Sequence, residues 1–199
     1  MAVPLLSPGP VRRNLRSDAG ITLIDVLVAV AVLATLSAMA VPTIQDMSSA
    51  IALGEARRMV QSELQQARLK AVSANRIMRV RFNCPLAGQF RMVELIGTPD
   101  VPAAPDTAAN RCNDAVYPFP APDANPVTLP NQDGPVRRIH SKVSFGAVQT
   151  IEFRPTGMAH SVNADGTSGP PLGGQGVSIT VTKGAAVKAV TVNALGRVQ

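Results

Sequence analysis

Residues 20–42 read GITLIDVLVAVAVLATLSAMAVP, and this stretch decides the architecture of the chain. Between residues 21 and 41 only Asp25 is charged, and a helix rising about 1.5 Å per residue covers in this length the roughly 30 Å of a bilayer core. Arg12, Arg13 and Arg16 precede it, and a positive excess beside a span is retained on the cytoplasmic side. The stretch therefore predicts a single membrane span, with its N-terminus in the cytoplasm and the larger C-terminal part outside.

Asp25 is unusual inside such a span, because a carboxylate at the centre of a membrane helix costs about 2.5 to 3.5 kcal/mol. One interpretation is an acid tolerated near the interface. The other is that Asp25 pairs with a cation in an assembly of helices. The nearest candidate for that cation is a new α-amine created by cleavage of the chain after Gly20.

The order Gly20, then ITLIDVLVAV, then Pro42 resembles the prepilin signature of type IV pilins and type II secretion pseudopilins. The resemblance implies that a prepilin peptidase cleaves after Gly20 and methylates Ile21 as the new N-terminus. It also implies that Asp25 meets the terminal amine of a neighbouring subunit. The family usually has Phe at the position of Ile21 and Glu at the position of Asp25. Ile21 keeps the apolar character of the first position, and Asp25 keeps the acidic character of the second.

The resemblance also implies a division of the chain into three parts. Residues 1–20 would be a cytoplasmic leader that the peptidase removes, and residues 21–42 the transmembrane part of the N-terminal helix. Residues 43–199 would form a periplasmic head that includes the rest of that helix. The subunit would be a single-pass inner-membrane protein until it joins a filament, periplasmic or at the cell surface, with other minor and major pilins or pseudopilins as partners.

An ordinary secretory signal peptide is a competing interpretation of the same stretch. Ala38-Met39-Ala40 has the small-x-small form of a signal peptidase site, and cleavage there would leave Val41 as the N-terminus. The apolar run is longer than the usual 7 to 15 residues of a signal peptide, and Asp25 would interrupt it.

Composition limits what the remaining 157 residues can be. They suffice for one compact domain. Aromatic residues make up 3% of the chain, with no Trp and a single Tyr117, so we expect a core of aliphatic side chains. The net charge of +6 is compatible with anionic partners.

Cys84 and Cys112 are the only cysteines. In an oxidising compartment they can form a disulfide, which would stabilise the head by roughly 3.5 kcal/mol in the chain-entropy model. The alternative is two unpaired thiols. A metal site is not indicated, because His140 and His160 are far apart in sequence and show no ligand spacing. We expect no cofactor.

Apolar residues recur at spacings of three and four between Ile44 and Ala71, which predicts that the N-terminal helix continues to about Ala74. The period then changes to two, which predicts antiparallel strands. The expected strands are 78–82, 89–96, 138–145, 150–154, 177–182 and 187–193, with an irregular loop over 97–135 and a Gly- and Pro-rich separator over 166–176. The predicted fold class is α+β: a pilin-like long N-terminal transmembrane helix packed on an antiparallel β-sheet head.

Three later segments are similar to the GspH/FimT group of minor pilins and pseudopilins. They are residues 62–71 (SELQQARLKA), residues 151–157 (IEFRPTG) and residues 195–198 (LGRV). Members of this group are low-abundance subunits near the filament tip. The resemblance therefore implies a minor structural subunit of a type II secretion pseudopilus or type IV pilus, without chemistry of its own.

The alternative function is DNA binding for uptake, as FimT-like members perform through a C-terminal Gly-Arg-x-Arg motif. Here the chain has Gly196-Arg197-Val198-Gln199, so only Gly196 and Arg197 correspond. Other basic residues could contact phosphates, unless they simply form a solvated strand face: Arg79, Arg81, Arg138, Lys142 and Lys188.

An enzyme is not indicated by the sequence. His140 and Ser141 are only sequence neighbours, with no nucleophile elbow around them. The glycines at 173–176 lack the Lys and Ser or Thr of a phosphate-binding loop.

Overall fold

The computed structural model describes residues 20–120 and 132–199, except for the side chains of residues 39–43 and 45. The chain divides into two compact units, one ending at Ile44 and one formed by Gln45–Gln199, which we call the head. Residues 1–19 of the predicted leader lie outside the described residues.

Helix α1 covers Leu23–Ser73, close to its predicted end. In its first half the large apolar side chains between Leu23 and Leu36 are exposed. Within the described residues, no helix is both long enough and apolar enough to cross a bilayer. The side chains of residues 39–42, at the end of the predicted span, lie outside the described ones.

The second half of α1 forms the centre of the head's core. A stripe at helical spacing is fully or almost fully buried: Leu53, Ala56, Val60, Leu64, Ala67 and Ala71. Met47, Ile51 and Met59 share the apolar spacing of three and four residues, but all three are exposed. The apolar spacing alone did not show which face of α1 is buried, and packing against the sheets decides this.

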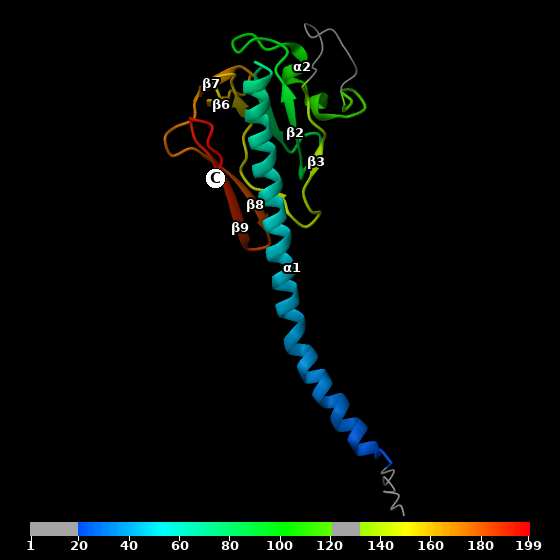
Figure 1. Cartoon of the computed structure of the whole chain (residues 1–199). Helices are drawn as coiled ribbons and strands as arrows, with labels where there is room; N and C mark the ends of the chain where they lie inside the picture. Colours follow the sequence, from blue (N-terminus) through cyan, green and yellow to red (C-terminus); the bar gives the residue numbers. More distant parts are fainter. Residues whose placement is uncertain (1–19, 121–131) are drawn as a thin grey trace, which may run out of the picture. The chain divides into compact units, whose positions relative to one another are not determined.

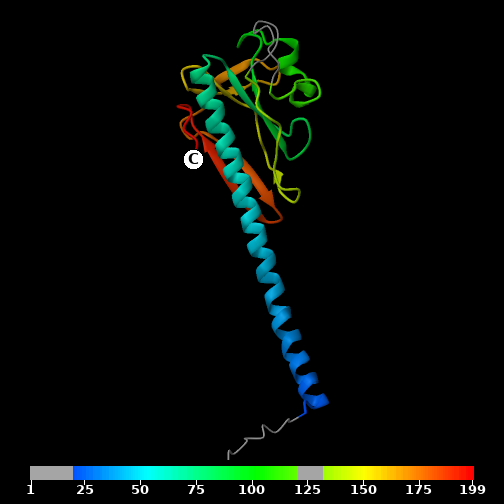
Figure 2. The same ribbon diagram turned by 45° about the vertical axis from the view of Figure 1, so that its right-hand side comes forward.

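Two antiparallel sheets pack on this half of α1 (Figures 1 and 2). The first has six strands in the order β3-β2-β1-β5-β6-β7, and the second has three in the order β4-β8-β9. The strands of the first sheet are Met78–Phe82 (β1), Gln89–Glu94 (β2), Arg137–Arg138 (β3), Ile151–Phe153 (β5), Ala159–Val162 (β6) and Ser168–Pro171 (β7). Those of the second are Ser144–Phe145 (β4), Val177–Lys183 (β8) and Ala186–Val192 (β9).

Most of the predicted strands are confirmed, and the one expected over 138–145 is wrong. The amide N–H of Val143 donates to the carbonyl oxygen of His140 at 2.8 Å, so the chain turns between β3 and β4. It leaves the first sheet after Arg138 and enters the second at Ser144. The alternating apolar and polar residues of 138–145 therefore belong to two short strands in different sheets.

Strands β6 and β7 were not predicted. β6 is short and contains His160 and Ser161, and β7 contains Gly169 and Pro170 inside the expected separator. β7 is the last strand of its sheet, and an edge strand tolerates Pro because one of its sides needs no N–H donors.

The loop after β2 holds two short helices, α2 at Ala104–Thr107 and the 3₁₀ helix η1 at Ala109–Cys112, while residues 121–131 lie outside the described ones. The predicted disulfide is confirmed: Cys84 and Cys112 are bonded, with their Cα atoms 5.4 Å apart. The bond ties this loop to the β1–β2 hairpin.

Candidate functional site

The N-terminal candidates lie where α1 begins. Gly20 and Ile21 are exposed, and among the described residues no heavy atom beyond the chain neighbours lies within 4 Å of a Cβ placed on Gly20. The Thr22 amide and hydroxyl donate to Asp25 Oδ2 at 3.1 and 2.7 Å, while the Asp25 amide donates to Thr22 Oγ1 at 3.3 Å. These reciprocal bonds form a capping box, which gives Asp25 a local role as well as the predicted one.

The three later segments singled out in the sequence meet at Arg68, on the last turns of α1. Its Nε donates to the carbonyl oxygen of Gly157 at 3.2 Å. Gly157 and Gly196 both have positive φ, at 80° and 70°. A Cβ on Gly196 would clash with the Gly157 carbonyl oxygen and press on Arg68, so only glycine fits this approach. No role was predicted for Arg68 from the sequence, although it lies inside segment 62–71.

A groove of about 550 Å³ lies beside this junction. One wall is formed by the α1 residues Gln65, Arg68, Leu69 and Val72, and the other by residues 196–198. Leu69 is 68% exposed, so the groove combines apolar surface with two guanidinium groups, those of Arg68 and Arg197.

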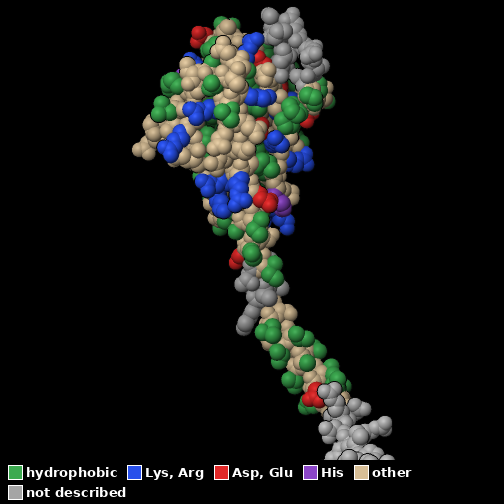
Figure 3. Space-filling view, in the orientation of Figure 1, with side chains coloured by type: hydrophobic (Ala, Val, Ile, Leu, Met, Phe, Trp, Pro, Cys, Tyr) green, Lys and Arg blue, Asp and Glu red, His purple; other side chains and the backbone are tan. Residues whose placement is uncertain are grey.

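The remaining basic candidates do not form one patch with Arg197. Lys188 is exposed on β9, with its Nζ 3.6 Å from a Cβ built on Gly54. Gly54 and Arg68 are separated by about 21 Å along α1, at about 1.5 Å per residue. Figure 3 accordingly shows Lys and Arg side chains in separate groups over this face of the head.

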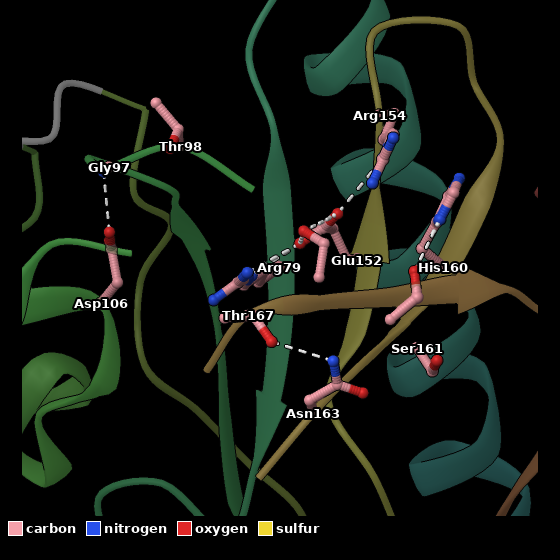
Figure 4. Close-up of polar contacts among 12 residues, drawn as sticks. Arg79, Gly97, Thr98, Asp106, Glu152, Arg154, His160, Ser161, Asn163 and Thr167 are labelled. Atoms are coloured by element: carbon pink, nitrogen blue, oxygen red, sulfur yellow. Dashed lines mark hydrogen bonds and ion pairs between the residues drawn. The ribbon is translucent and has the colours of Figure 1, made fainter. Parts of the chain in front are cut away.

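Arg79 was expected to face outward, and this is wrong. Its side chain is only 3% exposed, and its Nη2 lies 2.8 Å from Oε2 of the buried Glu152 (Figure 4). Arg81 is partly buried and donates through Nη1 to the carbonyl oxygen of Ala108 at 3.0 Å. A loop and a neighbouring strand cover this face of the sheet, which the alternation of 78–82 could not reveal.

Arg138 and Lys142 are exposed, as expected, near the turn between β3 and β4. Arg138 lines a second depression of about 390 Å³ together with His140 and Ser141. These two neighbours form no mutual hydrogen bond within the described part of the chain. Nor does that part contain a group of three His, Cys, Asp or Glu side chains able to hold a metal ion.

Glu63 is a buried acid on α1 that the sequence did not single out. Its side chain is 2% exposed, and Oε2 lies 3.3 Å from Nε of the half-exposed Arg137. Within the described residues Oε1 has no hydrogen-bond partner. Burial raises the pKa of Glu63, and Arg137 opposes this rise.

Comparisons with known proteins give limited similarity. No family model matches the chain, and no curated protein matches it. Two crystal structures of the type IV minor pilin FimU from Pseudomonas aeruginosa are similar to it, at 13% and 14% identity. Each alignment covers 74% of this chain and 86% or 90% of the FimU chain, with TM-scores of 0.42 and 0.41. The function proposed below rests on the residues of this chain.

Proposed function

We propose that the chain is a minor subunit of a type IV pilus or type II secretion pseudopilus. In this proposal a prepilin peptidase cleaves after Gly20 and methylates Ile21. Residues 21–42 anchor the subunit in the inner membrane, with the head in the periplasm. Asp25 then pairs with the α-amine of a neighbouring subunit as the helix enters the filament.

One observation carries the proposal: the single helix α1 holds both an exposed apolar segment and the buried stripe of the head. Leu23, Ile24 and Leu27 are 80%, 66% and 60% exposed. Side chains of this kind favour lipid or the helices of other subunits over water. Oδ1 of Asp25 receives no hydrogen bond within the described residues, which leaves it an acceptor for an amine.

The mass of the mature N-terminus tests the processing step. The full chain is co-expressed with a prepilin peptidase, and we expect a product that begins at Ile21 and carries one added methyl group. A Gly20→Val variant should remain uncleaved. A product beginning at Val41 would instead identify a secretory signal peptide and contradict the proposal.

The capping role of Asp25 can be separated from its charge. Asp25→Asn keeps a side-chain oxygen for Thr22 but removes the charge, so it should retain the helix and lose co-purification with partner subunits. Asp46→Asn is the matched control, because Asp46 is an exposed acid on the same helix. Normal assembly of Asp25→Asn would show that the carboxylate acts only as a cap.

DNA binding by the groove is a second candidate function. The tail lacks the second arginine of the Gly-Arg-x-Arg motif, but Arg68 lines the same groove as Arg197. Two guanidinium groups in one groove can contact neighbouring phosphates, whereas the buried Arg79 is not part of this candidate.

The salt dependence of binding tests this second function. If Arg68 and Arg197 each contact a phosphate, replacing either with Ala should reduce the slope of log K against log salt by about 0.7 to 0.9. Arg58→Ala is the control, since Arg58 is exposed on α1 but lies outside the groove. Equal slopes in all variants would contradict a groove site.

A further inference from the structure

The outer face of the six-stranded sheet, opposite α1, carries a cluster of arginines. Arg81 on β1 lies directly across from Arg91 on β2, and like charges at such positions destabilise a sheet. Arg79 precedes Arg81 on the same face of β1. Arg111 of η1 is close enough to affect Arg81 electrostatically.

Three of these four arginines have carboxylate partners. Arg79 pairs with Glu152, and Arg111 makes two bonds to Asp133. Arg91 lies 3.6 Å from Asp114 and 4.0 Å from Asp133.

Arg81 differs from them. Its one hydrogen bond goes to the Ala108 carbonyl, and across residues 20–120 and 132–199 it has no carboxylate within 4.0 Å. Among the described residues, this partly buried guanidinium with five N–H groups therefore has no carboxylate in ion-pair contact.

The same cluster has more hydrogen-bond donors than acceptors. Nη2 of Arg91 and Nε of Arg111 are buried and have no hydrogen-bond acceptor in the described part of the chain. The charge of Asp106 acts on Arg81. The two carboxylate oxygens of Asp106, however, already accept hydrogen bonds from the amide N–H groups of Ile96, Gly97 and Ala103. Burial, together with the nearby positive charges, lowers the pKa of Arg81.

A pocket of about 160 Å³ lies in front of Arg81. Thr150 and Asn163 line it and can supply a hydroxyl donor and the second amide hydrogen of Asn163, whose first is bonded to Thr167. The Asp106 carboxylate also lines the pocket, and the Thr107 hydroxyl there already donates to the Ala104 carbonyl oxygen. Gly166 closes one side, because it lies so close to Thr107 that a Cβ there would clash with the threonine methyl. Figure 4 shows Asn163 and Thr167 near Arg79 on this face of the sheet.

We propose that this pocket binds a free, small oxyanion of the phosphate or carboxylate class, with Arg81 as its principal ligand. The anion would supply the ion-pair contact that Arg81 lacks among the described residues, and it accepts hydrogen bonds from the guanidinium and the neighbouring side chains. A pocket of 160 Å³ is smaller than the roughly 300 to 1,000 Å³ of sites for drug-sized ligands, which favours a small ion. The proposal does not depend on assembly into a filament.

Calorimetric titration of the purified full chain with inorganic phosphate, at fixed ionic strength, tests the site. We expect saturable one-to-one binding, competition by acetate, no comparable effect of chloride, and at least tenfold weaker affinity in Arg81→Gln. Lys142→Gln is the control with an exposed cation away from the pocket, and it should bind as the parent does.

A second measurement covers the case in which Arg81→Gln does not fold. In the parent chain the arginine Nε–H resonance of Arg81 should shift on phosphate addition, while that of Arg79, bonded to Glu152, should move much less. Unchanged affinity in Arg81→Gln, an unmoved Arg81 resonance, or binding of DNA but not of phosphate would overturn the proposal.

Discussion

Glu63 and Gly196 show at the scale of single residues how much depends on surroundings that lie far away in sequence. Glu63 belongs to an ordinary stretch of polar helix, yet the head buries it beside Arg137. Gly196 lies near the end of the chain, yet it contacts Gly157 and Arg68. A substitution at each residue tests the effect of these surroundings on stability.

Glu63→Gln should stabilise the chain at neutral pH. In the folded chain the pKa of the Glu63 carboxyl is raised above the ordinary glutamate pKa of 4.5. The stabilising contribution of the protonated carboxyl is therefore fully present below the unfolded-state pKa, and it is lost as pH rises through the folded-state pKa. Urea unfolding should show a larger free energy of unfolding for Glu63→Gln than for the parent at about pH 7.5, and this difference should disappear at about pH 4. The exposed Glu55→Gln serves as control, and a gain that is independent of pH would contradict the argument.

Gly196→Ala should destabilise the head by about 1 to 3 kcal/mol, because alanine is strained at φ 70° and its Cβ meets the Gly157 carbonyl. Gly173→Ala is the matched control, because no heavy atom of the described residues beyond the chain neighbours lies within 4 Å of the added Cβ. The midpoint of thermal unfolding measures both variants, and equal midpoints would show that the two glycine loops separate freely.

At the scale of elements, α1 and the loop tied by the disulfide hold the head together. Ala67 and Ala71 are completely buried and belong to the core cluster of the head. The disulfide joins the β1–β2 hairpin to η1 across 28 residues of sequence. Each element can be disrupted without touching the proposed assembly segment.

Ala67→Leu should cost about 1 to 3 kcal/mol, since extra methyl and methylene groups cannot enter a close-packed interface without displacing the sheet. Gln66→Leu makes the same side chain at the neighbouring exposed position and should change the free energy of unfolding little. Equal effects of the two substitutions would argue against close packing at Ala67.

Replacing both Cys84 and Cys112 with Ala should lower the free energy of unfolding by roughly 3.5 kcal/mol, mostly because the unfolded chain without the cross-link has more conformational entropy. Denaturant unfolding of the parent with and without reductant provides the comparison. The double variant should be insensitive to reductant, and a parent that is equally insensitive would contradict a stabilising bond.

At the scale of the whole molecule, the two compact units differ in what they need to be stable. The head has its own core, formed by the second half of α1 and both sheets. The unit ending at Ile44 contributes no residue to that core within the described part of the chain. Its apolar helix residues are exposed instead.

Residues 45–199 should therefore fold without the preceding segment. We expect this truncated chain to unfold cooperatively, with a thermal midpoint within a few degrees of that of the full chain. Circular dichroism and limited proteolysis measure the outcome. A truncated chain that is rapidly digested would show that the first unit supports the head.

The sequence by itself determined the N-terminal helix, most of the strands and the α+β class, because local periodicity is a property of short stretches. It offered Cys84 and Cys112 as a pair but left two unpaired thiols as the alternative, and the structure shows the two cysteines bonded. The proposed processing signal around Gly20 and Asp25 is equally local. Only the tertiary structure decided that Arg79 is buried, that Met59 faces outward, that 138–145 divides between two sheets, and that Arg68, Gly157 and Gly196 meet. Those outcomes depend on contacts between segments far apart in the chain, which local patterns do not encode.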